Sequence, residues 1–92
     1  MSTVTVETFL IDEENEEKFW AHGIRRTQVV QRLDGPHSIK KNRKQRRASH
    51  LLVGRDGQGN CIAVPIEPTH DRTVWRPVTA WYCKSNDAEW LD

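Results

Sequence analysis

The sequence predicts an α+β fold in which two short N-terminal helices pack on one face of an antiparallel sheet. The first observation is an acid-rich helical stretch that follows Asp12 and stops at Gly23. The second is a series of β-branched and apolar runs in the second half of the chain, separated by turn residues. With 92 residues, the chain has room for a single domain, residues 1–92, with one modest core.

The first half is expected to hold one strand and the two helices. β-branched and aromatic residues predict a strand over Thr3–Ile11, and Asp12 then offers a side chain that can cap a helix. The acids that follow suit the positive end of the helix dipole. This helix should run to about His22. A second helix, with Thr27 near its start, should end at Asp34–Pro36.

The second half is expected to form the sheet. Four strands are predicted, and turns rich in Gly, Pro and Asp separate the last three of them. Their expected ranges are His37–Lys41, Ser49–Arg55, Asn60–Glu67 and Thr73–Cys83. We also expect a terminal helical turn over residues 85–92.

The expected register gives the sheet one aliphatic face and one mixed face. Only one alignment gathers the aliphatic side chains on the face that should pack under the helices. These are Leu51, Val53, Ile62, Val64, Ile66, Val74, Val78 and Ala80. The opposite face then carries His50, Leu52, Cys61, Ala63, Pro65, Glu67, Trp75, Thr79 and Trp81. His50, Glu67 and two exposed indoles should therefore share one open surface.

Positive charge is concentrated in one segment. Six of the eight residues from Lys40 to Arg47 are Lys or Arg, although the formal net charge of the chain is only +1. Such a field attracts phosphate backbones, because each neutralised phosphate releases counterions. The residues expected to bind RNA are Lys40, Lys41, Arg43, Lys44, Arg46 and Arg47, with Trp75 and Trp81 as platforms for its bases. A solvated loop, or one that binds an acidic protein, is the alternative.

The mixed face holds the parts for RNA cleavage without a metal. His50 is a candidate to move the proton of a 2′-hydroxyl, Glu67 is a second acid–base group, and Arg55 can stabilise developing negative charge. Ordinary solvent-exposed surface is the alternative for this face. No His/Cys cluster has the ligand spacing of a zinc site, so neither a metal nor another cofactor is expected.

Cysteine usage and hydropathy predict a cytoplasmic protein. Cys61 and Cys83 lack the spacing of metal ligands, and no secretory signal precedes them, so both are expected to be free thiols. No apolar run reaches membrane-spanning length, and no membrane contact is expected.

Five short motifs follow one another along almost the whole chain, namely Ile11–Glu13, His22–Ile24, Leu33–Pro36, Leu51–Arg55 and Trp75–Ala80. In this order they resemble the BrnT family of bacterial toxins, which are small ribonucleases with a RelE-like fold. The resemblance implies a RelE-like α+β toxin that cuts RNA without a metal and forms a complex with a cognate antitoxin.

Carried over by position, the matched polar residues are His22, Arg55 and Arg76. His22 can also simply close the first helix, where a positive charge suits the dipole. Two cations that are usual in the family are absent, since Ala21 stands in place of a Lys and Trp81 in place of an Arg.

Three functions are therefore compatible with the sequence. The first is a toxin-like, metal-independent ribonuclease of a toxin–antitoxin pair. The second is a nucleic-acid-binding module without catalysis. The third is a protein-interaction domain in which Trp75 and Trp81 form a docking patch. The sequence leaves open whether the chain is an enzyme.

Overall fold

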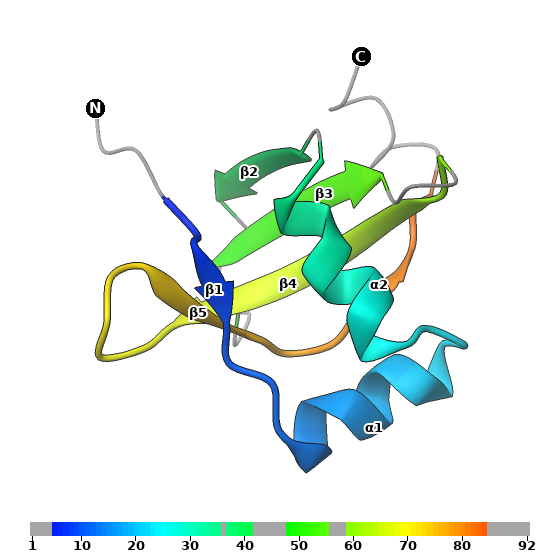
Figure 1. The fold of residues 1–92 in the computed structure, drawn as a ribbon, viewed down its shortest axis with the longest axis horizontal. Helices are drawn as coiled ribbons and strands as arrows, with labels where there is room; N and C mark the ends of the chain where they lie inside the picture. Colours follow the sequence, from blue (N-terminus) through cyan, green and yellow to red (C-terminus); the bar gives the residue numbers. More distant parts are fainter. Residues whose placement is uncertain (1–4, 36, 42–47, 56–58, 85–92) are drawn as a thin grey trace.

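The chain forms an α+β fold, seen in a computed structural model that describes residues 5–35, 37–41, 48–55 and 59–84 (Figure 1). The expected terminal turn over residues 85–92 and most of the basic segment lie outside the described residues. In chain order the elements are β1 (Thr8–Phe9), α1 (Glu13–Ala21), α2 (Arg26–Val30), a 3₁₀ turn η1 (Gln31–Leu33), β2 (His37–Lys41), β3 (His50–Arg55), β4 (Cys61–Pro68), β5 (Val74–Pro77) and β6 (Trp81–Tyr82).

The strands form one mixed sheet in the order β1-β5-β4-β3-β2, and β6 also pairs with β4. β1 runs parallel to β5, whereas all the other pairs are antiparallel. The expected antiparallel sheet was therefore wrong in one respect. The strand expected over Thr3–Ile11 is described only as β1, Thr8–Phe9, which precedes both helices. Its parallel pairing with β5, far along the sequence, makes the sheet mixed.

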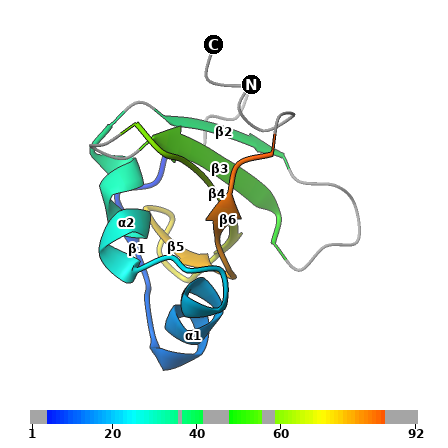
Figure 2. The same cartoon turned by 90° about the vertical axis from the view of Figure 1, so that its right-hand side faces the viewer.

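The two helices begin and end close to the predicted positions, but they do not form one layer on the sheet. Asp12 caps α1 by accepting a hydrogen bond from the Asn15 N–H, and Gly23 follows the helix with a φ of 72°. α2 lies across the sheet in front of β4, whereas α1 lies near one end of it (Figures 1 and 2). Phe19 is the only buried apolar residue of α1. The expectation that both helices cover one face was wrong, because a helix with a single buried apolar residue cannot cover a sheet.

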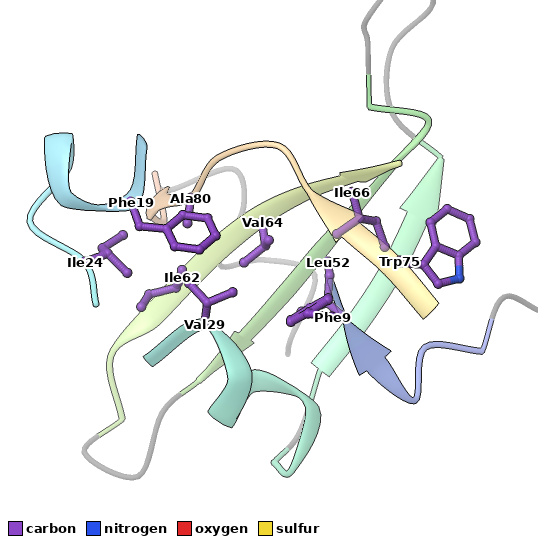
Figure 3. Close-up of a cluster of buried hydrophobic side chains, with 10 residues drawn as sticks. All are labelled: Phe9, Phe19, Ile24, Val29, Leu52, Ile62, Val64, Ile66, Trp75 and Ala80. Carbon is purple, nitrogen blue, oxygen red and sulfur yellow. The ribbon is translucent and has the colours of Figure 1, made fainter. Parts of the chain in front are cut away.

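The main core lies between α2, Phe19 of α1 and one face of the sheet, which we call the core face (Figure 3). Leu52 of β3 pairs with Val64 of β4 and belongs to this core. Leu51 and Val53 point to the opposite, far face, where they pack with Ala63. The expected register was therefore wrong by one residue in β3, and the faces are also exchanged in β5, where Trp75 rather than Val74 belongs to the main core. Leu51, Leu52 and Val53 are all buried, so this strand lacks the polar–apolar alternation that fixes a register.

The predicted strand over Thr73–Cys83 is divided into β5 and β6. Pro77 ends β5, and the Val78 N–H donates a hydrogen bond to the Pro65 carbonyl at 2.8 Å. Ala80 is fully buried in the main core before β6 begins. Proline has no N–H to donate to the hydrogen-bond ladder of the sheet. Pro65 and Pro77 are therefore accommodated by the irregular segment between β5 and β6.

Cys61 and Cys83 form a disulfide, with their Cα atoms 5.3 Å apart. The expectation of free thiols was wrong, and the expected cytoplasmic location loses that support. The pairing of β6 with β4 brings the two residues opposite each other, although 22 positions separate them in the sequence. No helix in the described part of the chain is long and apolar enough to cross a membrane.

Asn15 joins α1 to two other parts of the chain. Its side chain is fully buried, and its Nδ2 donates hydrogen bonds to the carbonyls of Leu10, at 3.0 Å, and Pro77, at 3.1 Å. Its Oδ1 accepts from the Asp12 N–H at 2.8 Å. The start of α1, the residue after β1 and the end of β5 therefore meet at one amide.

Replacing Asn15 with Ala is expected to lower the free energy of unfolding by about 2–3 kcal/mol, because it leaves the buried Pro77 carbonyl and the partly buried Leu10 carbonyl without their donor. Urea denaturation measures this loss. Glu17→Ala, at an exposed position of the same helix, is the matched control and should change stability by less than about 0.5 kcal/mol. Equal effects of the two substitutions would contradict the role of Asn15.

Candidate nucleic-acid interface

The adjoining ends of β2 and β3 bound the cationic segment. Lys41, the last residue of β2, pairs with His50, the first residue of β3. Lys40 and Lys41 are exposed, and neither strand contains an acidic residue. Arg43, Lys44, Arg46 and Arg47 belong to the connection between the strands and lie outside the described residues. The hairpin therefore presents positive charge at this end.

His50 lies at the same end of β3. Its ring meets that of Trp75 edge-on, with centroids 5.1 Å apart, and its Nδ1 lies 2.9 Å from the Ser49 Oγ. Partial burial, and next the positive charge of Lys41, lower the pKa of His50 below 6.5. A neutral imidazole beside a lysine is able to accept a proton, so His50 has the chemistry of a general base.

Glu67 is not placed to act with His50. His50 pairs with Ile66 and shares its face of the sheet, so the next residue along β4, Glu67, points to the other face. The Glu67 Oε1 lies 3.4 Å from the Arg76 Nη1 instead. The expected surface that combines His50 with Glu67 was wrong, and the one-residue change of register in β3 is the reason.

Arg76 lies at the centre of a network of three carboxylates. Its Nη2 lies 3.0 Å and 3.1 Å from the two carboxylate oxygens of Asp12 and 3.5 Å from the Glu14 Oε1, and its Nη1 contacts Glu67. Burial alone would lower the pKa of Arg76, but these carboxylates outweigh it and raise the pKa. The network joins the start of α1 to β4 and β5, and it leaves the guanidinium engaged within the protein.

The contact with Arg76 also affects the pKa of Asp12. The Asn15 N–H is the largest influence and the Arg76 side chain the next, and together they lower the pKa of Asp12 below 3.8. Glu14 and Asn15 were not among the residues expected to form a site. The spacing of Asp12 and Asn15, a polar pair three residues apart at a helix start, was the one available signal.

The two indoles expected to stack on bases are not freely exposed. Trp75 is only 8 % exposed, belongs to the main core, and donates its Nε1–H to the Arg72 carbonyl at 3.2 Å. Trp81 is half-buried on the far face, beside the disulfide. The expectation of two open indoles on one surface was wrong, because each ring helps to cover a different face of the sheet.

The remaining expected site residues are dispersed. Arg55 lies at the opposite end of β3 from His50, about 17 Å away by strand rise, and its Nη1 donates to the Gly59 carbonyl at 3.3 Å. His22 is exposed at the end of α1. In the described ranges no three His, Cys, Asp or Glu side chains gather as a metal site would require. The structure thus groups Lys40, Lys41 and His50, with the buried Trp75 ring against His50. It pairs Glu67 with Arg76 and leaves Arg55 and His22 apart from both groups.

The pKa of His50 can be tested by an NMR titration. We expect it to lie below 6.5, and Lys41→Ala should raise it part of the way towards that value, because burial is the larger cause. Because the pKa of His50 is lower in the folded protein than in the unfolded chain, His50 is protonated first in the unfolded chain as the pH falls. The free energy of unfolding should therefore decrease as the pH drops from 6.5 through the folded pKa.

Lys18→Ala, on α1, is the control and should leave this pKa unchanged. A pKa of His50 above 6.5, or equal shifts in the two lysine variants, would contradict the assignment.

Comparisons with known proteins give this chain no family. No family model matches the sequence, and neither a curated protein nor a solved structure gives a match.

Proposed function

We propose that this protein binds RNA through the end of the β2–β3 hairpin and the cationic run from Lys40 to Arg47, without cutting it. The observation that carries the proposal is the exposure of Lys40 and Lys41 at the end of two strands that contain no acid. The proposal includes a RelE-like fold and a cognate antitoxin as partner, both supported by the motif resemblance to the BrnT family.

The distribution of charge supports this function. The acids Glu13, Glu14, Glu16 and Glu17 gather on α1, and Figures 1 and 2 place α1 away from the end of the hairpin. A nearly neutral protein therefore has a basic end and an acidic helix. A phosphate backbone is attracted to the first and repelled by the second.

Binding is favoured over cleavage by the arrangement of the polar groups. His50 and Glu67 lie on opposite faces, and Arg76 is engaged by three carboxylates. Because Trp75 is buried and Trp81 half-buried, the contact should be mainly with phosphates and should depend little on base sequence. The burial of Trp75 likewise removes support from a docking patch made of these two indoles.

The salt dependence of binding tests the proposal directly. Each phosphate contact to a single strand contributes about 0.7 to the slope of log K against log[salt]. Replacing both Lys40 and Lys41 with Gln should therefore lower the slope by about 1.4 for a single-stranded RNA. Fluorescence anisotropy at several salt concentrations measures it.

Arg25→Gln supplies the matched control, because Arg25 is an exposed cation immediately before α2, next to the C-terminal end of α1 and away from the proposed contact. It should leave the slope unchanged. Replacement of Arg43, Lys44, Arg46 and Arg47 should lower the slope further. A slope that none of the hairpin substitutions alters would reject the hairpin as the contact.

A toxin-like ribonuclease is the second candidate, and the position of His50 favours it. The depressed pKa keeps the imidazole available as a base, and Lys41 lies beside it to stabilise negative charge. If this candidate is correct, the protein cuts RNA in the presence of a chelator and arrests growth when expressed. The product of an adjacent gene should relieve the arrest.

His50→Gln should then abolish cleavage and keep RNA binding, whereas Glu67→Gln, on the other face, should leave cleavage in place. If the wild-type protein binds RNA and leaves it intact, the binding function stands and the ribonuclease is rejected.

A further inference from the structure

The disulfide holds the shortest antiparallel strand of the sheet. We propose that Cys61–Cys83 is a redox-controlled latch, which keeps β6 on the sheet when oxidised and releases it when a thiol reduces the bond. The proposal is independent of RNA binding.

The backbone pairing of β6 with the sheet is short. It contains only Trp81 and Tyr82, which pair with Ala63 and Ile62 of β4. One further backbone bond joins the Cys83 N–H to the Cys61 carbonyl at 3.0 Å. A ladder of two residue pairs is far shorter than strands that are stable by themselves.

The two side chains of β6 differ in burial. Trp81 is half-buried and packs against the far-face cluster of Leu51, Val53 and Ala63, while Tyr82 is 46 % exposed. Ala80, immediately before β6, is fully buried in the main core on the other side of the sheet. The structure therefore divides at this point. The chain up to Ala80 is anchored by the core, whereas β6 is held by its short ladder, by the packing of Trp81 and by the disulfide.

Both cysteines are half-buried, so a small thiol can reach the bond. Its thiolate attacks one sulfur, forms a mixed disulfide and displaces the other cysteine as a thiolate, which takes up a proton. A second thiol then attacks the mixed disulfide and displaces the remaining cysteine. In total, two thiols become one disulfide, and both cysteines become thiols. Reduction removes the link that closes the chain between Cys61 and Cys83, so opening of β6 costs less free energy.

Hydrogen exchange of two backbone amides distinguishes local release from general unfolding. The Cys83 N–H bonds to the Cys61 carbonyl, and the Val78 N–H bonds to the Pro65 carbonyl of the same strand. After treatment with dithiothreitol, we expect the Cys83 amide to exchange about 100-fold faster. The Val78 amide, which lies before Ala80, should change by no more than a few-fold. Oxidised glutathione should restore the original rates.

A double variant, Cys61→Ser with Cys83→Ser, separates the effect of the bond from that of the reductant. The amide at position 83 should exchange rapidly in this variant, with or without dithiothreitol. Unchanged exchange of Cys83 after reduction would overturn the latch. Equal loss of protection at Val78 would also overturn it, because the bond would then stabilise the whole fold. Reaction of the cysteines with a thiol reagent before any reduction would show that no latch is present.

Discussion

The buried amide of Asn15 is the contact on which the arrangement of α1 and the sheet depends. It bonds to the carbonyls of Leu10 and Pro77, and with Asp12 it also completes the cap of α1. Since α1 buries a single apolar side chain, Phe19, hydrophobic packing alone holds it weakly. Hydrogen bonds and ion pairs at its N-terminus therefore fix its position. The same Asp12 carboxylate receives Arg76, so helix capping and the attachment of α1 to β5 rely on the same few atoms.

This junction also explains why Arg76 differs from the role that the motif resemblance implies for it. A guanidinium at the end of β5 has the reach to bind a phosphate, but Asp12, Glu14 and Glu67 supply the negative charge it needs. Its network stabilises the fold at the acidic end of the molecule. Lys40 and Lys41, at the end of β2, are exposed instead. The carboxylate-bound Arg76 and the exposed lysines thus lie on different strands, β5 and β2.

Local signals in the sequence identified most of the elements. Asp12 and Gly23 mark the ends of α1, and the turn residues mark the ends of β3 and β4 to within a residue or two. These features depend on contacts between residues close in the chain, which a linear pattern records. The candidate site was less accessible. The concentration of cations was visible directly, whereas the partnership of His50 and Glu67 depended on a register that the sequence did not specify.

The sequence by itself determined the α+β class, the capped first helix and the cationic run from Lys40 to Arg47. Only the tertiary structure decided which face each β3 side chain occupies, because Leu51, Leu52 and Val53 satisfy either face equally well. It also decided the pairing of β1 with β5, the disulfide between Cys61 and Cys83, and the enclosure of Arg76 by carboxylates. Each of these joins residues distant in the chain, and such contacts arise from the way the strands align rather than from any local preference.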